Sequence, residues 1–524
     1  MKLRTIVKIA ITSSVVLLCS GFALYSFFRL SAAEGRKDFN LYELVPSTTS
    51  AVFVTDDVLE FVAEVDDLTC SKNQQYLYVS KLFSYLKQSL YALSEDTPHG
   101  LSRQMNQMLI SFHEPDNERN QVLYCRLGNG DKELVNRFVR KYISSLYPPK
   151  TFVYKGEEII IYPMADGDFL ACYLTSDFMA LSFQKKLIEN VIDAYKSGKS
   201  LADDPTFTGV RAPKKSAAAA TIYARMKGMM GWTEFDMKMK DDFIYFSGIT
   251  HDADTCFAFI NQLRQQQSVK GFPGEVLPST AFYFSRQGIT DWVSLLSYGN
   301  AQEQNGAIRT SEVQNIDKEF SRYLMENAGQ DLVACLFQRE DTLQDAAAVL
   351  SLSVADVTEA ERMLRTLVNT APVDEGRKTP RITFGYTVNK AYLVYRLPQT
   401  TLFKQLTSFV ESTLDVYAAF YDGRLLLAPD ENALSQYIRQ LDKGEVLNGA
   451  MAYQAGMDHL SDSYHFMLMA DFDHIFRQSE NHVRFVPDFF LRNADFFHNF
   501  TLFVQFACTD GVVYPNIVLK YKSE

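Results

Sequence analysis

Hydrophobic and polar residues follow a pattern that occurs twice along this chain. Residues 44–48 (LVPST) and residues 276–280 (VLPST) each precede a short apolar run. Later, residues 169–181 and 416–427 each contain two apolar segments around a short polar turn, which is the pattern of a β-hairpin. The agreement in order and spacing predicts an internal duplication.

A helix is predicted after each hairpin. Leu187 and Val191 in the first copy, and Leu434 and Ile438 in the second, have the spacing of one apolar helical face. Each helix is expected to end at a glycine, because glycine readily adopts the left-handed conformation found at helix ends. These glycines are Gly198 and Gly444.

The remaining pattern predicts the fold class. The largely apolar residues 122–124 and 349–351 predict a strand before each hairpin, and short turns at residues 241–242 and 510–511 predict a closing hairpin in each copy. Because tight turns join antiparallel neighbours, we expect an α+β fold of two tandem homologous units, each a mainly antiparallel sheet with helices packed on one face. A doubly wound parallel sheet is the alternative, but regular alternation of strand and helix is missing.

The second copy carries two insertions. The first spans residues 398–415, where the spacing of apolar residues predicts an extra amphipathic helix. The second lies between Phe476 and Asn499 and is rich in aromatic residues. Because the copies share apolar pattern, turns and caps but no set of polar residues, we expect any individual task to lie where they differ.

The N-terminus predicts a transmembrane helix that acts as a signal anchor. Residues 9–28 contain no charge, and 20 residues at about 1.5 Å each span a hydrocarbon core of about 30 Å. Basic residues precede this run, so the positive-inside rule places the N-terminus in the cytoplasm and the remainder outside. A cleaved signal peptide ending near Ala33 and a lipoprotein acylated at Cys19 are the alternatives.

These patterns divide the chain into four parts. We expect the anchor in residues 1–30, a polar stalk in residues 31–43, a first α+β unit in residues 44–272 and a second unit in residues 273–524. A length of 524 residues fits more than one domain.

Composition and motifs argue against several classes of function. A net charge of −11, with no stripe of arginine or lysine, argues against nucleic-acid binding. The seven cysteines form no Cys-x-x-Cys pair, and the chain has no Walker loop, no Gly-x-Gly-x-x-Gly and no Gly-x-Ser-x-Gly motif. We therefore expect no cofactor, and we favour a protein that is not an enzyme.

Asp471, Asp473 and His474 are the candidate metal ligands. They follow an apolar strand and resemble the Asp-x-Asp motif of phosphoryl-transferring enzymes, in which one carboxylate attacks phosphorus. A metal-dependent hydrolase or phosphoryl-transfer enzyme is therefore the rival functional hypothesis. The first copy has no carboxylates at the matching residues 224–227, which favours a strand followed by a helix N-cap.

Aromatic and arginine residues crowd the second insertion. Arg484, Phe485, Phe489, Phe490 and Arg492 are candidate partner-binding residues, because exposed aromatic and arginine side chains are typical of binding hot spots. If these phenylalanines are buried, they instead close the core of the second unit. The rarity of large apolar patches on protein surfaces favours burial.

Several segments resemble a known family. The N-terminal anchor, the Val-Pro-Ser-Thr start, the segment YKGEEIIIY at residues 154–162 and the segment LSFQKKLIENVIDAYKSGKSL at residues 181–201 are similar to members of domain-of-unknown-function family 3352. The resemblance covers most of the ectodomain and implies a bacterial cell-envelope protein. It supplies no catalytic residues.

Together these features predict a single-pass protein of the inner membrane with a C-terminal ectodomain in the periplasm. The preferred function is non-catalytic binding or scaffolding of an envelope protein, lipid or peptide partner. A lipid or peptide carrier, which needs an apolar cavity between sheet and helices, is a further alternative.

Overall fold

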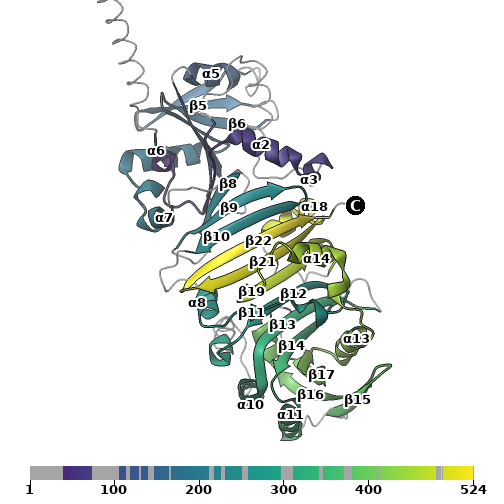
Figure 1. Cartoon of the computed structure of the whole chain (residues 1–524). Coiled ribbons are helices and arrows are strands. Elements are labelled where there is room, and N and C mark those ends of the chain that lie inside the picture. Colours follow the sequence, from purple (N-terminus) through teal and green to yellow (C-terminus); the bar gives the residue numbers. More distant parts are fainter. Residues whose placement is uncertain are drawn as a thin grey trace, which may run out of the picture.

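The computed structural model describes residues 39–73, 106–113, 119–128, 131–139, 147–164, 167–211, 218–225, 231–250, 258–296, 311–340, 346–370, 381–407, 409, 414–478, 486 and 488–522. Within these residues, 20 strands form one sheet in which every neighbouring pair is antiparallel (Figure 1). The predicted antiparallel sheet is confirmed, and the parallel alternative is wrong. A separate pair joins β11 (Val269–Lys270) to β19 (Ser463–Tyr464).

The two halves of the large sheet have the same strand order. From its outer edge inward, the first half is β4 (Lys150–Tyr154), β5 (Glu157–Pro163), β6 (Phe169–Leu174), β7 (Phe178–Ser182), β3 (Gln121–Arg126), β2 (Met108–Phe112), β1 (Ala51–Thr55), β8 (Ala220–Ala224), β9 (Thr233–Lys240) and β10 (Phe243–Thr250). The second half is β15 (Ile382–Tyr386), β16 (Ala391–Thr400), β17 (Leu414–Tyr421), β18 (Arg424–Ala428), β14 (Ala346–Val354), β13 (Ala328–Gln338), β12 (Ala281–Gly288), β20 (Phe466–Asp471), β21 (Phe500–Thr509) and β22 (Val512–Tyr521). The chain passes through the corresponding strand positions of the two halves in the same order.

The halves meet where β10 pairs with β22, at the centre of the sheet (Figure 1). Ser247 lies opposite Asn516 in this pair, and its Oγ is 3.2 Å from Asn516 Oδ1. Each of these residues stands at the same distance in sequence from the turn of its own hairpin, at Asp241 and at Asp510. Pairing of equivalent positions is the property of an isologous two-fold contact. The halves therefore join through β10 and β22, which occupy the same position in their own halves.

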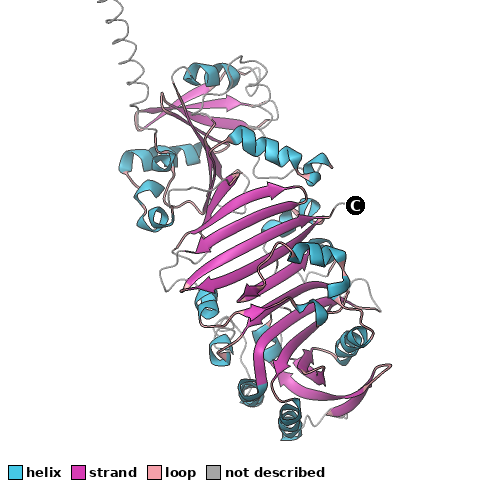
Figure 2. Ribbon diagram, in the orientation of Figure 1, coloured by secondary structure: helices cyan, strands magenta, loops and turns pink. Residues whose placement is uncertain are grey.

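Helices cover both faces of the sheet, so the prediction of helices on one face is wrong (Figure 2). One face, called here the α6 face, carries α6 (Lys185–Ser197), α7 (Pro205–Val210), α13 (Glu431–Asp442) and α14 (Met451–Met457). The opposite face, called the α2 face, carries α2 (Val58–Asp67), α5 (Asp131–Phe138), α10 (Ser311–Asn327) and α11 (Val357–Thr370).

Continuous apolar runs in the central strands explain this cover. In β3, residues 122–125 are all buried, although successive side chains of a strand point to opposite faces. Such a run needs apolar cover on both sides. On the α2 face one core runs through both halves, past Ile244 of β10 and Leu519 of β22, whereas each half has its own core on the α6 face.

The predicted turns and helix ends are confirmed. Asp241, Asp422 and Asp510 have positive φ at tight hairpin turns, in the left-handed region that aspartate tolerates. Gly198 and Gly444 also have positive φ and follow α6 and α13, as the predicted C-caps require.

The predicted anchor in residues 1–30, with its span 9–28, lies outside the described residues. Of the stalk predicted in residues 31–43, the structure describes residues 39–43, where η1 (Leu41–Leu44) begins. Among the described residues, no helix is long and apolar enough to cross a membrane.

The substitution Ile244→Ala tests the core that joins the halves. Ile244 is 1% exposed and packs in the core of the α2 face. Its truncation is expected to lower the free energy of unfolding by about 2–5 kcal/mol, because it leaves a cavity. Ile249→Ala is the matched control on the same strand; Ile249 is 39% exposed, and the loss should be under about 1 kcal/mol. Urea unfolding followed by circular dichroism gives both values, and equal losses would contradict a continuous core.

Candidate functional site

The Asp471 motif forms the start of a helix. Asp471 ends β20 and is the N-cap of α15 (Phe472–Phe476), where its side chain accepts hydrogen bonds from the backbone N–H groups of Asp473 (3.1 Å) and His474 (3.4 Å). Lys522 forms an ion pair with the same carboxylate, and Asp473 pairs with Arg477 at 2.8 Å. Burial raises the pKa of Asp471, but His474 and Lys522 outweigh burial and leave the pKa below its usual range.

These contacts give both carboxylates of the motif a structural role. Among the described residues, no group of three or more His, Cys, Asp or Glu side chains lies close enough to hold a metal ion. The arrangement is the predicted strand followed by a helix N-cap. An aspartate at this position satisfies backbone donors of the first helical turn.

The aromatic insertion packs against the core of the α2 face. Its described residues include two short helices, α17 (Asp488–Arg492) and α18 (Ala494–Phe497). The ring of Phe490 lies 4.8 Å from that of Phe472 and 4.9 Å from that of Phe497, measured between centroids. Phe497 and Phe500 are buried, and Phe490 and its neighbour Phe496 are half-buried. This part of the insertion closes the core of the second half.

The other candidate residues of the insertion are only partly described. Arg484 and Phe485 lie outside the described residues, and so does the side chain of Phe489, which belongs to α17. Arg492 is exposed at the end of α17.

The first insertion contains a short helix within the predicted segment. α12 (Leu402–Leu406) has five residues. Thr407 Oγ1 donates to the Phe403 carbonyl at 2.8 Å, where the helix ends. At its start, the buried carboxylate of Asp317 on α10 accepts hydrogen bonds from both Thr400 Oγ1 and Thr401 Oγ1 at 2.6 Å. The insertion is therefore tied to α10.

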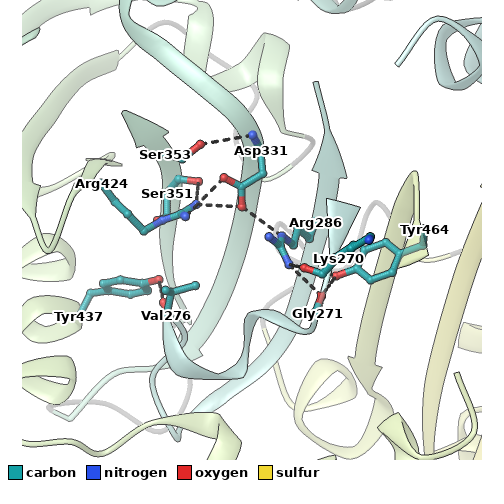
Figure 3. Close-up of polar contacts among 10 residues, drawn as sticks. All are labelled: Lys270, Gly271, Val276, Arg286, Asp331, Ser351, Ser353, Arg424, Tyr437 and Tyr464. Carbon is teal, nitrogen blue, oxygen red and sulfur yellow. Dashed lines mark hydrogen bonds and ion pairs between the residues drawn. The ribbon is translucent and has the colours of Figure 1, made fainter. Parts of the chain in front are cut away.

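A buried charge network crosses four strands on the α6 face of the second half. Figure 3 shows Arg286 of β12 and Arg424 of β18 converging on Asp331 of β13. Arg286 Nε lies 3.0 Å from Asp331 Oδ2, and Arg424 Nη2 lies 3.4 Å from the same oxygen. Arg424 also donates to the Ser351 carbonyl at 3.1 Å. Burial raises the pKa of Asp331, but the two arginines and a hydrogen bond from Ser353 lower it below its usual range.

Tyr464 of β19 seals the outer end of this network. Its side chain is fully buried, and its hydroxyl donates to the Gly271 carbonyl at 2.9 Å (Figure 3). Arg286 Nη1 donates to the same carbonyl at 2.9 Å and to the Tyr464 hydroxyl at 3.3 Å. A Cβ on Gly288 would lie 2.1 Å from the Gln267 carbonyl oxygen, so the backbone before β11 packs directly on the end of β12. Tyr464 and this backbone segment therefore cover the outer end of the network.

The position in the first half that corresponds to this charge network carries different residues. In the first half Val54 pairs with Thr221, and in the second half Arg286 pairs with Met467. Thr221 lies 246 residues before Met467 in the sequence, so Val54 takes the position of Arg286. The same register relates three further pairs of positions. In the first half Gln107 replaces Asp331, Asp56 replaces Gly288 and Ala218 replaces Tyr464.

A cavity of about 540 Å³ lies at this place in the first half. The ends of β1, β2, β3 and β8 form its floor, and η1 and α7 contribute its walls. Ala218 lacks the ring with which Tyr464 fills the equivalent space. Asp56 carries a side chain where Gly288 has none, so the close backbone packing seen in the second half cannot be repeated there. We call this cavity the first-half pocket.

The first-half pocket is lined by both charged and aromatic groups. The Arg211 guanidinium lies 4.1 Å from the centroid of the Tyr42 ring, and Arg126 lines the pocket from the end of β3. Gln107 Nε2 donates a hydrogen bond to Asp56 Oδ1. Burial raises the pKa of Tyr42 to about 12, and the charge of Arg211 opposes that rise. Because an ordinary tyrosine has a pKa near 10, the Tyr42 hydroxyl is a protonated donor at neutral pH.

Sequence reasoning missed the residues of this pocket. Tyr42, Asp56, Arg126 and Arg211 belong to no recognised motif and are far apart in the chain. The sequence alignment of residue 224 with Asp471 is one residue out of the register of the strands, in which Ala224 corresponds to Ala470, so only the structure pairs Ala218 with Tyr464. A small residue in one copy at the position of a large residue in the other marks a candidate cavity.

The substitution Asp331→Asn tests the charge network. It leaves two half-buried arginines without their carboxylate, so the free energy of unfolding at pH 7 is expected to fall by about 3 kcal/mol. Because the folded-state pKa of Asp331 is lowered, its carboxylate stabilises the fold above the unfolded pKa of about 3.9. This contribution disappears as the pH falls through the folded pKa, so the difference between wild type and variant should shrink in acid.

Urea unfolding at pH 7 and at a pH below 4 measures both effects. Glu319→Gln is the control, since Glu319 pairs with Arg322 at 3.0 Å on the surface and its loss should cost under about 1 kcal/mol. A difference between wild type and Asp331→Asn that does not depend on pH would contradict the assigned role of the carboxylate.

Comparison with known proteins gives one match. No curated protein and no solved structure matches this chain. The model of the family described as "Protein of unknown function (DUF3352)" matches residues 101–238, a segment that contains Gln107, Arg126, Arg211 and Ala218 of the first-half pocket. The predicted resemblance is thereby confirmed for residues 101–238, the segment that is similar to domain-of-unknown-function family 3352.

Proposed function

We propose that this protein is a membrane-anchored binding protein of the bacterial cell envelope, with a non-catalytic ectodomain in the periplasm. Residues 9–28 would form the single span in the inner membrane, with the N-terminus in the cytoplasm. The uncharged length of this run and the basic residues before it support the assignment.

The ectodomain is proposed to consist of two homologous units, residues 44–272 and 273–524. Support comes from the common strand order of the two halves and from the pairing of Ser247 with Asn516. A fused pair of equivalent units provides a rigid scaffold, because the core of the α2 face continues from one half into the other.

The first-half pocket is the observation that carries the proposed binding function. Its volume of about 540 Å³ falls in the range of small-molecule sites, which is about 300–1,000 Å³. The equivalent place in the second half is filled by Tyr464 and by the Arg286–Asp331–Arg424 network. One half thus keeps an open site, and the other uses the same volume to stabilise the fold.

This pocket favours a small ligand over the alternatives. A phosphoryl-transfer enzyme built on Asp471 and Asp473 finds less support, because one carboxylate caps a helix and pairs with Lys522 and the other pairs with Arg477. A scaffold that binds a protein through the aromatic insertion also finds less support, since the half-buried ring of Phe490 packs against the buried Phe497.

Protease protection tests the membrane topology. In spheroplasts, protease added from outside is expected to digest the chain after residue 30 and to spare a tag at the N-terminus, because the ectodomain should face the periplasm. Permeabilising the inner membrane should expose the tag as well. Release of the intact ectodomain without membrane disruption would contradict the anchor.

Native mass spectrometry of the full chain, extracted from membranes in mild detergent, tests the binding function. Wild type is expected to carry a bound small molecule that Ala218→Tyr lacks, because a tyrosine at this position fills the pocket as Tyr464 fills its equivalent. Ala452→Tyr, on the exposed surface of α14, is the matched control and should keep the molecule. The absence of a bound mass on wild type, or the same mass on Ala218→Tyr, would contradict the proposal.

A further inference from the structure

We infer that the outer end of the first half lies against the surface of the bilayer that holds the anchor, through an aromatic groove beside β4. This inference rests on the proposed membrane anchor, and it adds a second contact between the ectodomain and the membrane. The groove is called here the β4 groove. Its lining includes Tyr147, Lys150, Phe152, Ile161, Phe169 and Lys185.

The first argument is the exposure of large apolar side chains in the β4 groove. The groove has a volume of about 810 Å³ and lies on the α6 face, where the cover provided by α6 ends near Lys185. Phe152 is 42% exposed, Phe169 is 58% exposed and Tyr147 is 73% exposed. Contiguous apolar surfaces of this kind mark contacts with a partner or a membrane.

The second argument comes from the corresponding place in the second half. The hairpin of β6 and β7 has the same register as the hairpin of β17 and β18, which makes Ala171 equivalent to Tyr417. On the next strand outward, Ala171 pairs with Ile161, and Tyr417 pairs with Arg396. The apolar Ile161 of the β4 groove therefore corresponds to an arginine.

Phe169 in turn corresponds to Asp415, because each lies two residues before the equivalent positions on its strand. Arg396 Nη1 lies 3.5 Å from Asp415 Oδ2, and both side chains are nearly buried. An enclosed ion pair thus occupies the place where the first half exposes an aromatic ring.

The third argument is the length of chain between the proposed span and the described fold. The span ends at residue 28, and the described chain begins at Phe39, whose ring lies 4.8 Å from that of Phe178 and 5.9 Å from that of Tyr195 on α6. The connecting segment reaches at most about 40 Å even when fully extended. Lys185 lies about 15 Å along α6 from Tyr195, at a rise of about 1.5 Å for each residue. The β4 groove is therefore near the point where the tether enters the fold.

The fourth argument is the chemistry of the groove. Lys185 Nζ lies 5.4 Å from the centroid of the Phe152 ring, and Lys150 lines the groove beside it. Aromatic rings favour the boundary between acyl chains and headgroups, and ammonium groups beside them favour lipid phosphates. The carboxylate of Asp168, which also lines the groove, pairs with Arg119 at 2.7 Å. This combination fits a phospholipid surface.

Tryptophan fluorescence of the full chain in lipid nanodiscs tests this contact. The chain has two tryptophans, Trp232 and Trp292, and both are buried, so an added surface tryptophan is read against a constant background. The reporters are Phe152→Trp and, separately, Phe169→Trp. In nanodiscs of phosphatidylethanolamine and phosphatidylglycerol, the added emission is expected to shift to shorter wavelength. Lipids with brominated acyl chains should quench most of it, because bromine quenches only at close contact.

Phe384→Trp is the matched control. Phe384 is 65% exposed on β15, the outer strand of the second half. β15 lies at the opposite end of the molecule from β5 and α6 (Figure 1), so brominated lipids should leave its emission unchanged. Thermal unfolding of each variant shows whether it is folded.

The inference is overturned if brominated lipids leave both groove reporters unquenched, or if they quench Phe384→Trp equally. A shift to shorter wavelength without quenching would assign the groove to a protein partner, such as a second copy or a strand added at β4, and would also overturn it. Size-exclusion chromatography separates these failures from failure of the proposed function. A chain that does not co-elute with nanodiscs lacks the anchor, which overturns both; a chain that co-elutes without quenching keeps the anchor and lacks only the second contact.

Discussion

The antiparallel pairing of β10 with β22 is the contact on which the rest of the structure depends. It places Ser247 opposite Asn516, which are equivalent positions of the two halves, and it continues the hydrogen-bond ladder from one half into the other. Without this pair, each half would end in an open strand edge, and such edges invite aggregation. With it, the core of the α2 face passes through the junction, and the two halves share one hydrophobic interior.

Joining two similar halves in one chain frees them to differ. The second half places Arg286, Asp331 and Arg424 where the strand ends meet, and Tyr464 closes the space above them. This arrangement is self-sufficient, because every charge has a partner inside the protein. A buried arginine without such a partner would be unfavourable.

The first half has no such charge network at the corresponding positions. Its strands carry Val54 and Gln107 at the corresponding positions, and Ala218 leaves open the volume that Tyr464 fills. Arg126, Arg211 and Tyr42 line this open volume. The same scaffold position is therefore filled by a charge network in one half and left as a pocket in the other.

The amino-acid sequence by itself determined the local elements and their order: the hairpins, the turns at Asp241 and Asp510, and the cap at Gly198. These depend on signals within a few residues, such as alternation and left-handed positions. Tertiary structure alone decided that helices cover both faces, that β10 meets β22, and that Ala218 lies beside Tyr42 and Arg211 in a pocket. Those outcomes depend on contacts between distant segments, and the apolar pattern of a strand does not reveal which segment will cover it.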